Sequence, residues 1–411
     1  MPETSLAWIV ERAVDWWLPM AVYGALPTIG VIAGPSYAPL VFGLAVVQLL
    51  HGLAVRRRLP DVDRALLSVA LGFVALCWAS AAWSIVPEHS LMSALQMTGI
   101  AAAALVFLAA RPLPDTIAER LFHVVLVACL VGSAIVVVDT LLGDPLESFV
   151  AAKPNIDAAT KYNRGLDYLG FIVWPELAWL CWRRRRATAL LLAAAVIVAL
   201  ALGSSLAGRM AGVAGAIVLA LAWFAPRVVA VVLTWGTALF AGLLPFALRS
   251  LCANRAALVP YVKASGVNRL EIWDYMTARV LERPLLGWGI SSASSVPIRP
   301  DELAHYVSLA GLQTYPHNQW LELWVETGAL GAMAGAVLEW LVLRRIGRMP
   351  SPIRPFAYAA FASAMTVSCI NFEVTTDSWW AALAASGFLF TALGRLVSGT
   401  SARDRRVGWL V

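Results

Sequence analysis

Long apolar segments alternate with short polar ones along nearly the whole chain. A helix that crosses a membrane needs about 20 mostly apolar residues. Windows of that kind lie near 16–34, 37–55, 65–85, 91–110, 121–142, 166–182, 188–205, 209–225, 228–248, 325–343, 355–372 and 379–397. The pattern therefore predicts an all-α integral membrane protein with about twelve transmembrane helices.

Composition agrees with that assignment and excludes other classes of protein. Of the 411 residues, 60% are hydrophobic and 14% are charged, whereas soluble domains are about a quarter charged. The net charge of +6 does not indicate a nucleic-acid partner, because the basic residues fall in short clusters between apolar segments. The five cysteines show neither metal-ligand spacing nor a disulfide framework, so we expect no metal site.

Sequence motifs for soluble cofactors are missing as well. The chain contains no P-loop, no dinucleotide-binding fingerprint and no HExxH or GxSxG motif. We therefore expect no cofactor, and a nucleotide-linked sugar has no recognisable site on the cytoplasmic side. These observations favour a donor that is already carried in the membrane.

The arginines indicate how the chain crosses the membrane. They cluster after the windows near 37–55, 166–182 and 325–343, whereas the alternate short loops 86–90 and 373–378 contain no Lys or Arg. Positively charged loops stay in the cytoplasm, so both termini are predicted to be cytoplasmic.

Two longer loops then face the opposite side of the membrane. The predicted division is 1–248 for transmembrane helices 1–9 with a loop near 143–165, 249–324 for a large loop between helices 9 and 10, and 325–411 for helices 10–12 with a cytoplasmic tail. Loops this long in a compact protein are usually functional. We therefore expect the chemistry in or beside the large loop.

The large loop ends in YPHNQWLELWVETG, residues 315–328. Pro316 favours a turn, and Gln319 to Thr327 is predicted to be a helix closed by Gly328, with His317 in its first turn or at its cap. The partial positive charge of a helix N-terminus keeps an imidazole neutral. A neutral His can accept a proton or bond a phosphate oxygen. A cap or interface role for His317 is the alternative.

Arg209 is unexpected where it stands, in LGSSLAGRMAG between two apolar windows on the extracytoplasmic side. An Arg at membrane depth costs about 2.5–3.5 kcal/mol and tends to mark a function, and the small residues around it allow a ligand to approach closely. Snorkelling to the interface is the alternative. Arg164 is a further cation on this side, and Glu322 and Glu326 share a helical face on which they could orient or balance such cations.

Arg269 opens an amphipathic loop helix in NRLEIWDYMTARVLERP, with Asn268 and Glu271 as its predicted cap and Pro284 as its predicted end. Arg binds phosphate oxygens in bidentate fashion and can hold a pyrophosphate without a metal. Trp273, one turn later, could stack on a sugar. The alternatives are a solvated surface Arg and an interfacial or packing Trp.

The segment NRLEIWDYMTARVLERPLLGWG, followed by YPHNQWLELWVETGALG, resembles the signature of the O-antigen ligase/polymerase superfamily. The shared features are an Arg-x-x-x-Trp helix, a Pro-x-x-Gly-x-Gly turn and a His–Asn pair followed by Glu-x-Gly-x-x-Gly. The local match covers 268–331, and the predicted spans and loop position extend the resemblance along the chain.

The resemblance implies a GT-C-like glycosyltransferase of the bacterial inner membrane, with its active site facing the periplasm. It implies an undecaprenyl-diphosphate-linked glycan donor, a lipid A–core or glycan acceptor, and an inverting transfer that needs no metal. Carried over residue by residue, Arg209 and Arg269 would neutralise the diphosphate leaving group. His317 would act as the base on the acceptor hydroxyl or assist the diphosphate.

Further residues enter through the same resemblance. Those expected to bind substrate are Trp273, Asn318, Glu322, Glu326 and Arg164. An acidic residue near the last periplasmic turn is also implied, and either Glu373 or Asp377 could take that position. Membrane lipids are expected partners, and the oligomeric state is left open.

Different functions follow from different acceptors. A ligase moves a finished glycan onto lipid A–core, whereas a polymerase of O-antigen or exopolysaccharide joins repeat units. The ligase is our leading hypothesis, and the polymerase is the alternative because ERPLLGWG and PHN also resemble polymerases of the superfamily. A transporter of the lipid-linked glycan would require inverted repeats and broken helices, and the two halves show no clear self-similarity. Arg209 argues against a purely structural scaffold.

Overall fold

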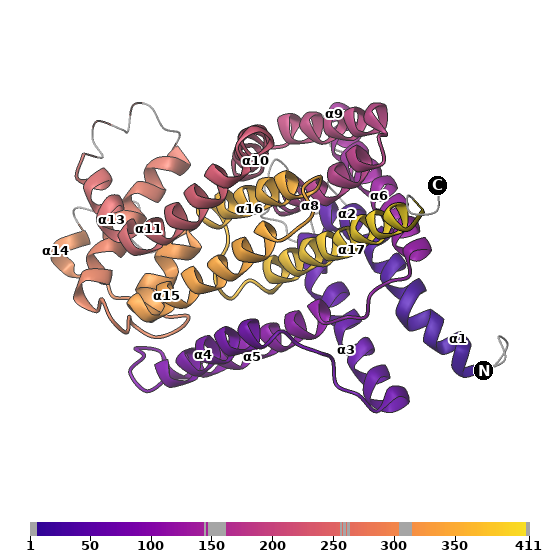
Figure 1. Cartoon of the computed structure of the whole chain (residues 1–411). Coiled ribbons are helices and arrows are strands. Elements are labelled where there is room, and N and C mark those ends of the chain that lie inside the picture. Colours follow the sequence, from indigo (N-terminus) through magenta and orange to yellow (C-terminus); the bar gives the residue numbers. More distant parts are fainter. Residues whose placement is uncertain are drawn as a thin grey trace.

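The computed structural model describes residues 6–143, 145–146, 162–254, 257, 260, 264–303 and 315–407. Within these ranges every regular element is a helix (Figure 1). The helices before the loop near 143–165 are α1 (Leu6–Arg12), η1 (Ala13–Trp17), α2 (Leu18–Ile32), η2 (Gly34–Ser36), α3 (Tyr37–Arg56), α4 (Arg64–Ser80), α5 (Pro87–Leu108) and α6 (Asp115–Leu141). Those after it are α8 (Asn163–Trp182), α9 (Arg186–Leu202), α10 (Leu206–Phe224), α11 (Pro226–Ala253), α13 (Ala264–Glu282), η5 (Ala293–Ser295), α14 (Pro300–Leu303), α15 (Gln319–Gly347), α16 (Arg354–Ser368) and α17 (Asp377–Val407).

The apolar windows of the sequence do form helices, and the all-helical class is confirmed for the described residues. Among the described residues, seven helices are long and apolar enough to cross a membrane: Gly34–Arg56, Pro87–Leu108, Asp115–Leu141, Leu206–Phe224, Pro226–Ala253, Gln319–Gly347 and Asp377–Gly399. The other windows correspond to α2, α4, α8, α9 and α16, of which α2 and α16 have only 15 residues each. The count of about twelve spans and the GT-C-like detail therefore stay predictions.

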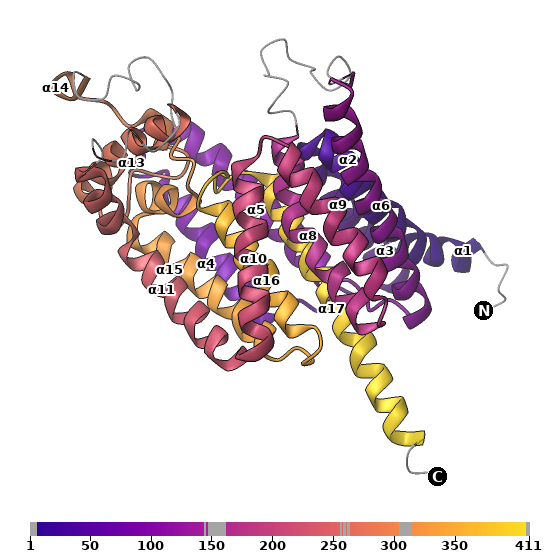
Figure 2. The ribbon, with the colours of Figure 1, turned by 90° about the horizontal axis from the view of Figure 1, so that it is seen from above.

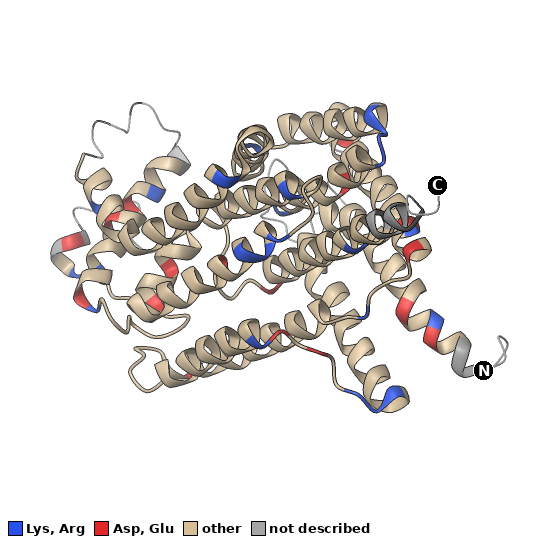
Figure 3. Cartoon of the chain, in the orientation of Figure 1, with Lys and Arg blue, Asp and Glu red and all other residues tan. Residues whose placement is uncertain are grey.

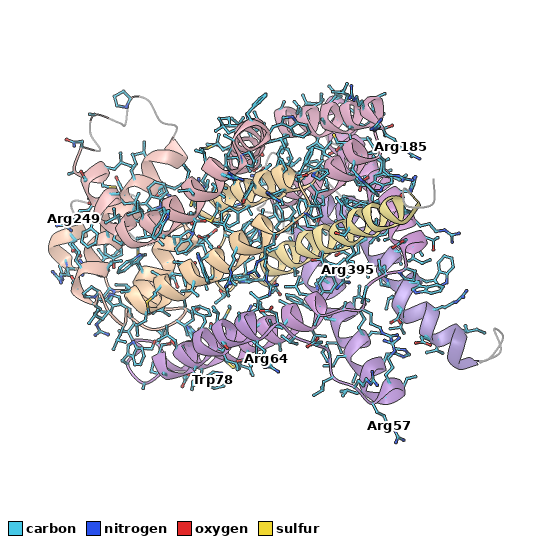
Figure 4. The ribbon with its side chains drawn as sticks, viewed as in Figure 1. Arg57, Arg64, Trp78, Arg185, Arg249 and Arg395 are labelled. Carbon is cyan, nitrogen blue, oxygen red and sulfur yellow. The ribbon has the colours of Figure 1, made fainter. Side chains whose placement is uncertain are left out.

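The elements that border the large loop gather at one end of the molecule. In both views α13, α14 and the start of α15 lie at that end, and the two chain ends lie away from it (Figures 1 and 2). Residues of both charge signs mark the α13 region, whereas α4 and α5 carry few (Figure 3). Figure 4 places Arg57 and Arg185 away from α13, and Arg249 close to it. The predicted sidedness requires this separation; the orientation itself stays a prediction.

Two clusters of buried apolar side chains hold the helices together. One joins α2, α6, α8, α16 and α17 through residues such as Tyr23 and Trp179. The other joins α4, α5, α11 and α15 to the loop helix α13, through residues such as Tyr275 and Trp320. The loop helix is therefore part of the packed core. By contrast, large apolar side chains point outward along α9, α10 and α11, where Phe224 is 87% exposed, as expected for a surface that faces lipid.

Helix α15 is interrupted at Gly328, where φ is 63° and ψ is −156°. The turn after α13 bonds to the backbone groups that this break leaves free. The amide of Gly289 donates to the carbonyl of Glu326 (2.8 Å), and the amide of Ala329 donates to the carbonyl of Pro284 (2.9 Å). The Gly-rich turn thus replaces hydrogen bonds that the helix loses and fixes the loop to α15.

Candidate active site

The segment 315–318 places His317 just outside the start of α15. Asn318 is the cap of that helix, because its Oδ1 accepts hydrogen bonds from the amides of Trp320 (3.1 Å) and Leu321 (3.0 Å). His317 therefore lies one residue before the cap, not in the first turn or at the cap as the sequence predicted. It adopts a left-handed φ of 50°, a conformation that costs a non-glycine residue about 1–3 kcal/mol and tends to occur at functional sites.

Two neighbouring aromatic residues fix the turn that carries His317. The indole Nε1 of Trp273 on α13 donates to the carbonyl of Pro316 (2.8 Å). The ring of Tyr315 lies against the imidazole, with 4.0 Å between ring centroids. Trp273 and His317, both predicted site residues, are thus connected through the backbone of Pro316. Its expected stacking on a sugar stays a prediction.

The imidazole of His317 is kept neutral. Burial, and secondarily the charge of Arg269, lower the pKa of His317 from 6.5 to about 4. The predicted neutrality is confirmed, although burial and an Arg, rather than the helix end, account for it. The Nδ1 atom is buried and has no hydrogen-bond partner among the described residues. A neutral, unpartnered ring nitrogen is therefore available beside a cation.

Arg269 belongs to the same cluster of side chains. It is half-buried on α13, and burial lowers its pKa against the favourable charges of Tyr315 and Asp167. The helix begins at Ala264 and ends at Glu282. The predicted cap at Asn268 is wrong, because the chain is already helical before that residue.

Arg164 approaches from α8. Its guanidinium interacts electrostatically with Tyr315 and with Glu373, which precedes α17. Burial raises the pKa of Glu373, and Arg164 opposes that rise. Of the two acidic candidates at this turn, Glu373 acts on Tyr315. Asp377 is exposed at the start of α17 and accepts from the amide of Ser378 (2.6 Å).

Arg209 lies in the first turn of α10, exposed, with its Nε donating to the carbonyl of Ser205 (3.3 Å). Ser205 caps α10 by accepting from the amide of Gly208 (3.0 Å). The same hydroxyl donates to Asp167 on α8. The connection from Arg209 to the other site residues therefore runs through Ser205 and Asp167.

Asp167 is the site residue that the sequence reasoning missed. It is fully buried, and its two carboxylate oxygens accept from Ser205 and from the side-chain amide of Asn371. Arg164 and Arg269 both interact with it electrostatically. The available signal was a carboxylate inside the apolar window 166–182, where a buried charge is costly unless it is bonded.

The remaining predicted residues hold the backbone around the site. Glu322 and Glu326 are buried on α15. Glu322 accepts from the amide of Val374 (2.8 Å), and Glu326 accepts from the amide of Ala293 (3.2 Å). Each carboxylate thus anchors a loop to α15. Their predicted part in substrate binding, like that of Asn318, stays a prediction.

Comparison with known proteins gives the same family as the motifs. Residues 191–336 match the model of a family described as O-antigen ligase. A Rickettsia bellii protein with a provisional polysaccharide-ligase name is 24% identical over 386 residues, which cover 87% of this chain and 93% of that protein. Similarly named proteins of Rickettsia conorii and Rickettsia felis are 24% and 25% identical over 226 residues, about half the length of each. The match and these relatives confirm the resemblance drawn from the sequence: residues 191–336 are similar to the O-antigen ligase family, and most of the chain is similar to a relative named as a polysaccharide ligase.

Proposed function

We propose that this chain is an inner-membrane glycosyltransferase of the O-antigen ligase type. It moves a glycan from an undecaprenyl-diphosphate carrier onto a lipid A–core acceptor at the periplasmic face. The GT-C-like fold, the spans beyond the seven candidates and the cytoplasmic termini belong to this proposal. The observation that carries it is a neutral His317, within electrostatic reach of Arg269, whose Nδ1 atom has no hydrogen-bond partner in the described part of the chain.

The arginines of the site bind the diphosphate of the glycan donor in this proposal. Arg164, Arg209 and Arg269 come from three helices, and Arg164 and Arg209 are exposed. Guanidinium groups bind diphosphate oxygens in bidentate fashion and stabilise the charge that develops as the leaving group departs. In this proposal they take the place of a metal ion.

The transfer is one inverting displacement. The acceptor hydroxyl oxygen forms a bond to the anomeric carbon of the donor while the bond from that carbon to the diphosphate oxygen breaks. The hydroxyl proton passes to the imidazole of His317, and undecaprenyl diphosphate leaves with the bonding electrons. Bound diphosphate offsets the charge of Arg269 and so raises the pKa of His317 when a base is needed. In the alternative role, the neutral imidazole donates to a diphosphate oxygen.

Trp273, Asn318 and Glu322 hold the segments that carry these groups and do not react themselves. Trp273 and Asn318 fix the turn on either side of His317. Glu322 holds Val374, the residue next to Glu373. We therefore propose positioning roles for all three in addition to any contact with the sugar.

Reconstitution tests the proposal and separates it from the polymerase. Purified protein receives an undecaprenyl-diphosphate-linked oligosaccharide in a chelator-containing buffer, with or without rough lipopolysaccharide, and the products are separated on a gel. The proposal predicts a single upward shift of the rough lipopolysaccharide and no product without it. Longer lipid-linked chains in the absence of acceptor would instead establish a polymerase. Unchanged donor in both mixtures, as for a transporter, would contradict both.

A further inference from the structure

Asp167 connects three segments that are far apart in the sequence. Its Oδ1 accepts from Ser205, the cap of α10, and its Oδ2 accepts from Asn371, in the segment before α17. These partners lie 38 and 204 positions away along the chain. An amide at 167 would offer only one acceptor oxygen, whereas a carboxylate serves both donors at once.

Each of the connected segments carries a charged group of the proposed site. Arg164 lies one turn before Asp167 on α8. Arg209 lies one turn after Ser205 on α10 and donates to its carbonyl. Glu373 lies two residues after Asn371. A shift of any one segment would therefore move a charge that the donor diphosphate is proposed to meet.

The hydrogen bonds and opposite charges around Asp167 offset part of the cost of burying its carboxyl group. The side chain is fully buried, and a buried charge is tolerated when it is hydrogen-bonded and faces opposite charge. Both oxygens are bonded, and Arg164 and Arg269 act on it electrostatically. Asp167 thus lies near the cations, but its hydrogen bonds go to Ser205 and Asn371 and not to the exposed guanidinium groups of Arg164 and Arg209.

We propose that Asp167 is a positioning residue of the transfer site, which holds the segments bearing Arg164, Arg209 and Glu373 in register around Arg269. This inference rests on the proposed function. Through Ser205 it also fixes the start of α10, because the same hydroxyl accepts from Gly208 and donates to Asp167. Asp167 does not contact the reacting atoms in this account.

Exchange of the acid and the amide tests the inference. Asn371→Asp places two carboxylates face to face, and like charges at hydrogen-bond distance repel strongly. We expect kcat/KM for the donor to fall at least about tenfold, mainly through a higher donor KM. Adding Asp167→Asn again places an amide N–H opposite a carboxylate oxygen. The kcat/KM of the double variant should therefore recover to within about threefold of wild type. The exposed Asn254→Asp is the matched control and should leave the donor KM unchanged.

Thermal unfolding midpoints are measured for the same variants. A merely structural role would reduce the amount of folded protein without changing the donor KM of the folded fraction. If Asn371→Asp does not fold, Ser205→Ala takes its place and should raise the donor KM while the protein stays folded. An unchanged donor KM in the folded single variant, or no recovery in the double variant, would overturn the inference.

The same series separates this inference from the proposed function. Full activity in both His317→Ala and Arg269→Ala would mean that the proposed function has failed. Loss of activity in those two variants, without recovery in the exchanged pair, would mean that only the positioning role has failed.

Discussion

At the scale of single residues, the backbone contacts on either side of His317 explain its environment. Trp273 bonds Pro316, Asn318 caps α15, and the residue between them is left in the left-handed region. The turn thus sets the imidazole beside Tyr315 and within electrostatic reach of Arg269. The sequence motif identified the His, but the half-burial that makes it neutral requires the fold.

The depressed pKa of His317 predicts how stability changes with acidity. In the unfolded chain the imidazole gains its proton near pH 6.5, whereas in the folded protein it does so only near pH 4. Between these values the unfolded state binds more protons, so this contribution to stability is lost as the pH falls from about 6.5 towards 4. Replacing His317 by Gln removes the contribution.

We therefore expect the thermal unfolding midpoint to drop less between pH 7 and pH 5 in His317→Gln than in wild type. The difference should be about 1–3 °C, because the residue is only half-buried. Differential scanning fluorimetry at the two pH values measures it. Equal drops in the two proteins would show that His317 titrates in its ordinary range.

The sequence predicted the site residues that lie in contiguous motifs, but it did not reveal Asp167. Arg269, Trp273 and His317 lie in contiguous motifs, and the structure brings them together. Asp167 was not recognised, because a lone carboxylate in an apolar window carries no information about its partners. Those partners, Ser205 and Asn371, meet it only after α8, α10 and the segment before α17 have packed.

At the scale of elements, apolar periodicity located the helices because membrane-length apolar segments have few other structures available. The stop at Gly328 was also predicted, and the helix does break there. Beyond the break, α15 continues as the apolar window near 325–343 predicted, whereas the role of the turn after α13 in bridging the break was not predicted. That role depends on hydrogen bonds between segments about 40 residues apart, which no local pattern shows.

The break in α15 predicts opposite effects for two glycine substitutions. At Gly328, an added Cβ would overlap the carbonyl of Leu285, and the φ of 63° is strained for any other residue. We expect Gly328→Ala to destabilise the protein by about 2 kcal/mol or more, with loss of activity because the turn would leave α15.

Gly236 provides the matched control within α11. An added Cβ there meets nothing within 4 Å in the described part of the chain. Gly236→Ala should be neutral or stabilising by up to about 1 kcal/mol, because alanine favours the helix. Thermal unfolding of both variants in the same detergent measures the contrast. A Gly328→Ala midpoint equal to that of Gly236→Ala would contradict the account of the break.

At the scale of the whole molecule, the arginine-rich turns after α3 and α8 lie apart from the candidate active site. The arginine-rich turns after α3 and α8 lie away from α13, as Arg57 and Arg185 show (Figure 4). The loop helix α13, the start of α15 and the segment before α17 meet near the opposite end, where Arg269, His317 and Glu373 act on one another or on Tyr315. A bilayer between these ends would put the site at one surface, within reach of a lipid-linked donor.

We propose that His317 and Arg269 serve one transfer reaction. The most direct measurement is the rate of rough-lipopolysaccharide modification by wild type, His317→Ala, Arg269→Ala and Arg249→Ala at saturating donor. Arg249 is the matched control, because it is an exposed Arg near the same end of the molecule (Figure 4).

We expect His317→Ala and Arg269→Ala each to lose at least about 100-fold in rate, while Arg249→Ala stays within about twofold of wild type. All four proteins should elute as the same folded species. Wild-type rates in both His317→Ala and Arg269→Ala would show that neither residue is needed for the transfer.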